Sequence, residues 1–486
     1  MKNYFTRQNL PKLVLLLAMV SLLVFTRYYN LSSTARYTND EASDLAHIYQ
    51  LGQSFKITLV GPISSDNSKV FGSLTYYLQL PFVMAFNYSA VSPAIGTAFW
   101  SVITALLMVL LTLKMNRSLR YWMWGLVLVW YPLVETGRWA WNPHFILLWI
   151  FAGLIAFLIN KRWSMYLAGL LMGLSFHHHY VAIVALFGFF LTQAVALTHK
   201  TKGLIKDTFI KILLFAAGIG SALLPFVVFD LRHPPGLFFT RYLSSGSIPH
   251  VASSSADSLI VKFAQVLSGS AGYLVANSQF VWLFGALVVT VLVLDFRNNR
   301  KAIRWLLPVM VQLLGMSFLD QYASRYFLPA IPFFIYWLLI PRKNAFSQLL
   351  IKLVMAVMIL SSVVQLPSLL TQTRVQPSPA AAEKIIQTIR VGMSQHPTVD
   401  INLAVLSSPD SAPLGDSYRV VLGMYGISLK QPSEYDTTSR LIVISTADET
   451  TLRQDESAAM VYFKEVPLEK TDEIDQTGWK VYWFQK

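Results

Sequence analysis

The chain has 486 residues, of which 54% are hydrophobic and 13% are charged. Soluble globular proteins carry about 25% charged residues, so this composition excludes an ordinary soluble enzyme. The chain contains no cysteine, which excludes disulfides, thiolate nucleophiles and zinc-thiolate sites. The apolar residues gather into runs of about 15 to 25 residues separated by short polar stretches, a pattern typical of a polytopic α-helical membrane protein.

The net charge of +14 is divided unevenly along the chain. Residues 1–370 contain 28 Lys and Arg but 10 Asp and Glu, whereas residues 371–486 contain 11 and 15. The basic residues stand at the ends of the apolar runs and form no single basic face, which argues against nucleic acid as a partner. The sequence therefore predicts a multi-span membrane domain at residues 1–370, a linker at 371–378 and a small soluble domain at 379–486.

About eleven apolar runs are expected to cross the membrane. The first, residues 13–31, lacks a small-residue cleavage site, so we interpret it as an uncleaved span and not as a signal peptide. The other spans are expected near residues 93–113, 121–134, 143–160, 163–176, 180–198, 209–229, 273–294, 305–319, 326–340 and 348–366.

The orientation follows from the basic residues in the connections between these runs. Of the 28 basic residues in the membrane part, 19 lie in the N-terminal segment and in alternate connections. The positive-inside rule makes that side cytoplasmic, which predicts a bacterial plasma-membrane protein with a cytoplasmic N-terminus and an extracytoplasmic C-terminal domain. Eight of the ten acidic residues of the membrane part then lie on the extracytoplasmic face.

The first extracytoplasmic loop, residues 32–92, contains two expected helices. Thr38 or Asn39 can cap a helix whose first turn holds Asp40 and Glu41, and Asp44 shares a face with Asp40. A well-capped surface helix without catalytic function is the alternative interpretation of these acids. Residues 74–86 are apolar and aromatic but interrupted by a proline, which is typical of a helix lying in the membrane interface.

Several short motifs follow one another on the predicted extracytoplasmic side. In chain order they are Asn39-Asp40-Glu41, residues 72–81 (GSLTYYLQLP), 137–143 (GRWAWNP), 173–176 (GLSF) leading to His179-Tyr180, 224–226 (LPF) with 229–233 (FDLRH), and 324–329 (SRYFLP). This order resembles the C-type membrane glycosyltransferases, in particular bacterial relatives of the dolichyl-phosphate-mannose protein mannosyltransferases and of the lipid A aminoarabinose transferase. The resemblance covers roughly residues 10–340.

The resemblance implies an enzyme that moves a sugar from a polyprenyl phosphate donor to an acceptor at the outer membrane face, with inversion. Such a reaction needs a carboxylate to take the proton of the attacking acceptor. Asp40 is the first candidate for this base and Glu41 the second. The sugar stays open, as does the acceptor, which could be a protein, a lipid or a glycan. Membrane lipid is the other expected partner.

The leaving phosphate needs cations at the water interface, preferably guanidinium groups. Arg325 and Arg232 are the candidates, although either could be an anchor that binds bulk lipid headgroups. Glu135 and Arg138 are expected to pair across one helical turn, while sugar binding or metal ligation by Glu135 stays open. The residues expected to bind substrate are Asp44, Glu135, Arg138, Asn142, His179, Tyr180, Arg232, His233, Tyr322 and Arg325.

The consecutive residues His177, His178 and His179 cannot all ligate one ion, because neighbouring helical side chains point about 100° apart. No cofactor is therefore assigned, and a role for a divalent metal stays open. His179 itself is a candidate hydrogen-bond donor to phosphate or sugar.

The C-terminal domain is expected to be α/β, with helices near residues 380–394, 416–425 and 450–460 and strands near 400–406, 441–445 and 479–484. Two other functions stay open for the chain: a transporter or flippase of lipid-linked saccharides, and a polysaccharide polymerase or ligase. A transporter commonly has inverted repeats, and the sequence shows no such symmetry.

Overall fold

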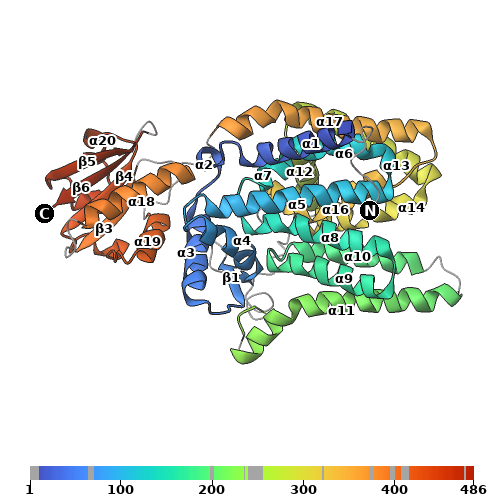
Figure 1. Cartoon of the computed structure of the whole chain (residues 1–486), viewed down its shortest axis with the longest axis horizontal. Coiled ribbons are helices and arrows are strands. Elements are labelled where there is room, and N and C mark those ends of the chain that lie inside the picture. The colour runs from blue at the N-terminus through green and yellow to red at the C-terminus, as the bar shows by residue number, and fades with distance from the viewer. Residues whose placement is uncertain are drawn as a thin grey trace.

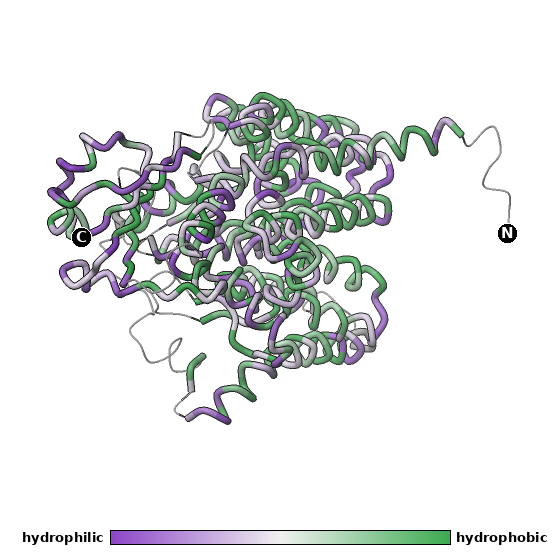
Figure 2. The backbone as a smooth tube through the Cα atoms, turned by 60° about the vertical axis from the view of Figure 1, so that its left-hand side comes forward, coloured by the Kyte–Doolittle hydropathy of each residue, from purple (hydrophilic) through white to green (hydrophobic). Residues whose placement is uncertain are grey.

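The computed structural model describes residues 10–63, 70–197, 202–234, 236–238, 256–319, 322–372, 377–394, 400–406, 415–474 and 478–486. Long helices form a bundle, and an α/β unit made of residues 379–486 lies against one end of it (Figure 1). Hydrophobic residues dominate the bundle, whereas the C-terminal unit carries more hydrophilic segments (Figure 2). The division into a membrane domain at residues 1–370, a linker at 371–378 and a domain at 379–486 stays a prediction.

Fourteen described helices make up the bundle, which has two distinct ends. They are α1 (Leu10–Tyr28), α5 (Ser92–Met115), α6 (Arg120–Val129), α7 (Tyr131–Thr136), α8 (Ile146–Ile159), α9 (Arg162–Leu174), α10 (Ala182–Leu197), α11 (Lys202–Arg232), α12 (Ala256–Val275), α13 (Ser278–Asn298), α14 (Arg300–Ile303), α15 (Leu307–Ser317), α16 (Ile331–Leu339) and α17 (Ala345–Thr371). All residues of α16 are buried, so this helix forms the centre of the bundle. We call the end with α14 the basic end, and the end that bears the C-terminal unit the loop end (Figure 1).

Six helical segments in the described part of the chain are long and apolar enough to cross a membrane: Leu10–Thr34, Ser92–Met115, Asn142–Ile159, Ile205–Arg232, Ser278–Asn298 and Ala345–Thr371. Two shorter apolar helices, Ala182–Ala196 and Leu259–Val275, accompany them. The multi-span character predicted from the sequence is thus present, and the count of eleven spans stays a prediction.

Two of the predicted spans are wrong in detail. The span expected at residues 273–294 is interrupted, because Ala276 adopts a left-handed backbone (φ 55°) and the side chain of Asn277 caps α13. The helix α12 precedes this break and was not predicted. The span expected at 121–134 is divided into α6 and α7 at Trp130, where Pro132 follows in the first turn of α7 and cannot donate a backbone hydrogen bond.

The first large loop contains α2 (Leu31–Thr34), α3 (Asn39–Ser54), β1 (Val60–Ile63), β2 (Val70–Gly72) and α4 (Leu74–Ala85). The predicted start of α3 is correct: Thr38 and Glu41 form a capping box, in which the backbone N–H of Thr38 donates to Oε2 of Glu41 (2.7 Å). The helix expected at residues 74–86 is α4, and its position in the membrane interface stays a prediction. The short antiparallel pair of β1 and β2, which lies between α3 and α4, was not foreseen.

The C-terminal unit has a four-stranded sheet in the order β3-β4-β6-β5, in which β3 and β4 are parallel and the other pairs antiparallel. Its elements are α18 (Pro379–Ser394), β3 (Ile401–Leu406), α19 (Asp416–Met424), β4 (Arg440–Ser445), α20 (Glu449–Arg453), α21 (Ala458–Val461), β5 (Leu468–Ile474) and β6 (Trp479–Gln485). The helix predicted at 450–460 is wrong, since α20 and α21 are separate. The strand β5 was missed because its sequence, LEKTDEI, is mostly charged and exposed, as edge strands often are.

One hydrophobic core joins the C-terminal unit to the first loop. Ala42, Leu45 and Ile48 of α3 pack in the same buried cluster as Ile385 of α18 and Leu422 of α19. A polar contact accompanies this core: the backbone N–H of Ala90 donates to Oε2 of Glu383 (2.9 Å). The acidic helix α3 is consequently held between the bundle and the C-terminal unit.

Candidate active site

An aromatic pair marks the candidate site at the loop end of the bundle. Trp139 and Trp141 lie in the turn after α7, and their rings stack with centroids 5.0 Å apart. The ring of His144 stands edge-on against both, and its Nδ1 lies 2.8 Å from the carbonyl oxygen of Trp139. We call Trp139 and Trp141 the tryptophan pair. Its geometry is fixed by these packed neighbours.

Two guanidinium groups lie over the tryptophan pair. The Cζ atom of Arg36 is 4.0 Å from the ring centroid of Trp139, and that of Arg325 is 4.5 Å from the same centroid. Arg325 also lies 5.3 Å from the centroid of Trp141. Cations at such distances are attracted by the ring electrons, which holds both charges in place. The structure thus brings together residues that are 289 positions apart in the chain, from Arg36 to Arg325.

Sequence reasoning predicted Arg325 but missed Arg36. The only signal for Arg36 was its place two residues before the cap of the acidic helix, at Thr38. A charged residue at that position is equally typical of an ordinary loop.

Glu41 contacts the tryptophan pair directly. Its Oε1 accepts a hydrogen bond from the indole Nε1 of Trp139 (2.5 Å), while Oε2 is bound by Thr38. The carboxyl is buried, and this burial raises its pKa, although the hydrogen bonds from Thr38 and Trp139 act in the opposite direction. With both oxygens engaged, Glu41 joins the start of α3 to the aromatic pair.

The other two acids of α3 differ in their surroundings. Asp44 is buried and bonded to the hydroxyl of Tyr76 on α4, and burial raises the pKa of its carboxyl well above the usual range. Asp40 is half-buried, and its side chain is the most exposed of the three. Its negative charge raises the pKa of both Glu41 and Asp44. Asp40 therefore belongs to the same cluster and is the acid most accessible to a substrate.

Glu135 lies beside the guanidinium groups. Its Oε1 is 3.6 Å from Arg36, and its Oε2 accepts a hydrogen bond from the hydroxyl of Tyr273 on α12 (3.2 Å). The predicted pairing of Glu135 with Arg138 is wrong, because the side chain of Arg138 points toward the end of α1. There it donates to the carbonyls of Arg27 (3.0 Å) and Tyr29 (2.9 Å), where the helix dipole favours a cation.

The three histidines have separate surroundings, as expected. His177 donates from Nε2 to the carbonyl of Ala222 (2.7 Å), while His178 lies between Thr75 (2.8 Å) and the indole of Trp149 (2.8 Å). Only His179 reaches toward the site, where its ring is 6.4 Å from Trp141 and 5.3 Å from Tyr326. Within the described ranges, no group of three or more His, Asp or Glu side chains could hold a metal ion.

The remaining predicted residues divide between the site and its surroundings. Asn142 supports the chain nearby, donating from Nδ2 to the carbonyl of His178 (2.6 Å). Tyr322 bonds to Ser270 of α12 through its hydroxyl (3.0 Å). Tyr180 lies parallel to Phe71 of β2, with centroids 6.3 Å apart.

Arg232 and His233 lie in a different place from the tryptophan pair. Both are exposed at the C-terminal end of α11, and the ring of His233 stacks on Phe229 of the same helix (4.4 Å). In Figure 1 this helix runs along the outer edge of the bundle. The structure thus gathers Asp40, Glu41, Glu135, His179 and Arg325 of the predicted set around the tryptophan pair.

Comparisons with known proteins find similarity in structure alone. No family model matches the chain, and a search of curated proteins gives no match. Among solved structures, ArnT from Cupriavidus metallidurans in the apo state aligns with a TM-score of 0.58 at 10% sequence identity, covering 97% of this chain and 98% of that one. The chain has the fold of ArnT.

A second structure of ArnT, bound to undecaprenyl phosphate, aligns over the same shares of both chains with a TM-score of 0.56 and 10% identity. ArnT is an aminoarabinose transferase with the C-type glycosyltransferase fold. The fold that the order of motifs predicted is thereby confirmed. Because 97% of the chain is aligned, the match with ArnT extends well into the C-terminal unit.

Proposed function

We propose that this protein is a glycosyltransferase that takes a sugar from a polyprenyl phosphate donor and transfers it to an acceptor at the extracytoplasmic membrane face. The observation that carries the proposal is the pair of guanidinium groups, Arg36 and Arg325, over Trp139 beside the acidic helix α3. The shared fold with ArnT supports it, since a structure of ArnT holds undecaprenyl phosphate.

In the proposed reaction, Arg36 and Arg325 bind the phosphate of the donor. Guanidinium groups form paired, charge-assisted hydrogen bonds to phosphate oxygens, and these strengthen as the bond to the sugar breaks and negative charge grows. The neighbouring Glu135 limits the net charge at Arg36 and keeps its guanidinium oriented. Arg232, exposed at the end of α11, has no part in this proposal.

Asp40 is the proposed general base. The oxygen or nitrogen of the acceptor attacks the anomeric carbon, its proton passes to the carboxylate of Asp40, and the bond from that carbon to the phosphate oxygen breaks. The electron pair of this bond stays on the lipid phosphate. Attack from the side opposite to the leaving group inverts the anomeric centre. Asp40 is preferred over Glu41 because both oxygens of Glu41 already accept hydrogen bonds.

Trp141, the more exposed ring of the tryptophan pair, is proposed to hold the sugar together with its neighbours. Aromatic faces pack well against the apolar face of a sugar ring, and the carboxylate of Glu135 can accept hydrogen bonds from its hydroxyls. His179, whose ring lies near that of Trp141, is proposed to donate a hydrogen bond to the sugar. No step of the proposed reaction is assigned to a metal.

Binding of undecaprenyl phosphate to the purified full-length chain tests the proposal. Tryptophan fluorescence in detergent is the readout, since two tryptophans lie at the proposed phosphate site. We expect Arg325→Gln and Arg36→Gln to weaken binding by about tenfold or more each, because a hydrogen bond to a charged group contributes about 1.5 to 3 kcal/mol. Turnover of a labelled polyprenyl-phosphate-linked sugar by the wild-type protein is the second measurement.

Arg232→Gln is the matched control, since it removes the same charge from the end of α11. Equal binding by Arg232→Gln and wild type supports the assignment. Loss of binding in Arg232→Gln together with unchanged binding in the other two variants would show that the phosphate binds elsewhere. Binding of the lipid with no turnover of any donor would contradict the transferase function itself.

A further inference from the structure

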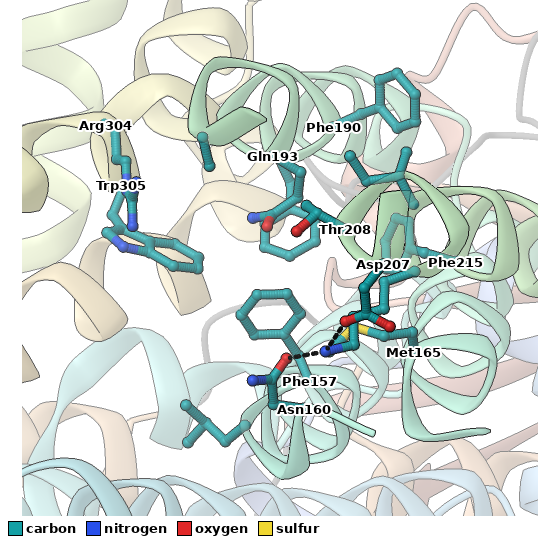
Figure 3. A pocket seen from close by; sticks show the side chains of 15 residues that line it. Phe157, Asn160, Met165, Phe190, Gln193, Asp207, Thr208, Phe215, Arg304 and Trp305 are labelled. Atoms are coloured by element: carbon teal, nitrogen blue, oxygen red, sulfur yellow. Dashed lines mark hydrogen bonds and ion pairs between the residues drawn. The ribbon is translucent and has the colours of Figure 1, made fainter. Parts of the chain in front are cut away.

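A cavity of about 470 Å³, whose lining side chains are drawn in Figure 3, lies at the basic end of the bundle. The tryptophan pair lies at the loop end. It is enclosed by the last turns of α8 and α10, the first turns of α9 and α11, and the segment of Arg304 and Trp305 that precedes α15. None of the residues that form the proposed transferase site contributes to its walls.

The inner wall of this cavity is aromatic. Phe189 lies at its centre, with its ring centroid 5.3 Å from those of Phe157 and Phe215 and 5.9 Å from that of Trp305. Phe157 and Trp305 also meet edge-to-face at 5.7 Å. This continuous apolar wall would exclude a small hydrated anion but suits a hydrocarbon chain.

The mouth of the cavity is polar and has an excess of positive charge. The amino group of Lys211 contacts Asp207 (2.9 Å) and Oδ1 of Asn160 (3.1 Å), and Asp207 also pairs with Arg162 (3.3 Å). One carboxylate is therefore shared by two cations. Figure 3 shows Arg304 on the other side of the cavity, across from this chain of contacts. Its Nε is buried and, within the described part of the chain, has no hydrogen-bond partner.

Exposed apolar side chains continue from the cavity along the outside of the bundle. Phe190, which lines the cavity, and Phe209 and Leu213 of α11 are 36%, 52% and 52% exposed. On helices apolar enough to lie in a membrane, such a surface faces lipid. A ligand that is charged at one end and apolar at the other would match both parts of this region.

We propose that this cavity binds an anionic phospholipid of the cytoplasmic leaflet, with its phosphate at Arg304 and Lys211 and the start of one acyl chain against Phe157 and Phe190. The predicted topology places the basic end at that leaflet, and basic pockets between membrane helices there are suited to anionic headgroups. The site is separate from the donor site and does not depend on the proposed transferase chemistry.

The test uses the full-length chain purified in a neutral detergent. Short-chain phosphatidylglycerol and phosphatidylcholine with the same acyl chains are added separately, and bound lipid is counted by native mass spectrometry. We expect phosphatidylglycerol to bind more tightly. Arg304→Gln should weaken its binding by about tenfold, since one charge-assisted contact is lost. Ala196→Phe, which fills the cavity without changing charge, should weaken it as well and serves as the test if Arg304→Gln does not fold.

Lys206→Gln is the control, because Lys206 is exposed on α11 next to Asp207 but does not line the cavity. The Lys206→Gln variant should bind phosphatidylglycerol as tightly as the wild type does. Equal binding of the two lipids overturns the proposal, and so does wild-type binding by Arg304→Gln or Ala196→Phe. Inorganic phosphate that displaces the lipid at millimolar concentration, with Ala196→Phe unaffected, would assign the cavity to a free anion and also overturn it.

Discussion

Three carboxylates within five residues of α3 have different tasks. Glu41 caps the helix and binds Trp139, Asp44 joins α3 to Tyr76 of α4, and Asp40 is the most exposed of the three. A carboxylate whose two oxygens accept hydrogen bonds, as those of Glu41 do, is a poor proton acceptor. Burial, and not residue type, distinguishes the proposed base Asp40 from Glu41 and Asp44.

Asp40→Asn should therefore abolish turnover with little change in melting temperature. General bases contribute about 10²- to 10⁴-fold to rate, and a loss of that size is expected with a labelled polyprenyl-phosphate-linked sugar as donor. Glu41→Gln should instead lower the melting temperature, because an amide has a single acceptor oxygen and cannot accept from both Thr38 and Trp139. Full activity of Asp40→Asn with loss of activity in a stably folded Glu41→Gln would reverse the two roles.

Asp44→Asn should be more stable than the wild type at high pH, and the difference should grow as the pH rises. Burial raises the pKa of Asp44 in the folded chain, so the folded state binds more protons than the unfolded state from the usual aspartate range upward. The stability of the wild type therefore falls as the pH rises above the usual aspartate pKa. The neutral amide of the variant can still accept a hydrogen bond from Tyr76, and its stability does not fall in this way. The melting temperatures of Asp44→Asn and the wild type, measured between about pH 4 and pH 8, should differ more as the pH increases.

The exposed Asp436 provides the control for this experiment, as Asp436→Asn changes the same charge at the surface of the C-terminal unit. A pH-independent difference between Asp44→Asn and wild type would contradict the assignment of Asp44 as a buried carboxyl.

At the scale of elements, α3 is the part of the molecule on which both halves converge. Its apolar face shares a core with α18 and α19, and its acidic first turn faces the tryptophan pair. The backbone N–H of Ser417 on α19 also donates to Oδ1 of Asn39 (3.2 Å), next to Asp40. We propose that the C-terminal unit positions the catalytic turn of α3 in addition to any contact with the acceptor.

Leu422→Ala tests this coupling. Leu422 is fully buried in the shared core, and truncation of such a side chain costs about 2 to 5 kcal/mol. We expect reduced turnover as well as a lower melting temperature, with binding of undecaprenyl phosphate retained, since Arg36 and Arg325 do not belong to that core. Val420→Ala, on the exposed side of α19, should change neither. Loss of stability without loss of turnover would limit the C-terminal unit to a structural role.

The helix α12 marks the limit of sequence reasoning about elements. Its hydroxyl, glycine and charged residues dilute the apolar pattern that identifies a span, so only its last residues were included in a prediction. Yet α12 supplies Tyr273 to Glu135 and Ser270 to Tyr322. Contacts between distant segments of this kind depend on packing, which no local pattern records.

For the whole molecule, the sequence predicted what depends on composition and order. Apolar runs gave the bundle, capping residues gave the start of α3, and the succession of motifs gave the fold shared with ArnT at 10% identity. It could not predict that Arg36 meets Arg325 over Trp139, because three separate segments make that site. It also misassigned Arg138, whose partners are the hydroxyl of Thr34 and backbone carbonyls at the end of α1, and a backbone carbonyl carries no sequence signal.

Cysteine labelling tests the orientation of the whole molecule, because the chain contains no cysteine of its own. Ser54 at the end of α3 and Ser118 between α5 and α6 are both exposed and lie in connections that the charge pattern places on opposite sides. In intact spheroplasts, a membrane-impermeant maleimide should react with Ser54→Cys and should reach Ser118→Cys only after permeabilisation. Equal labelling of both variants in permeabilised cells is the control for accessibility. The reverse pattern would place α3 and the tryptophan pair in the cytoplasm and contradict an extracytoplasmic transfer.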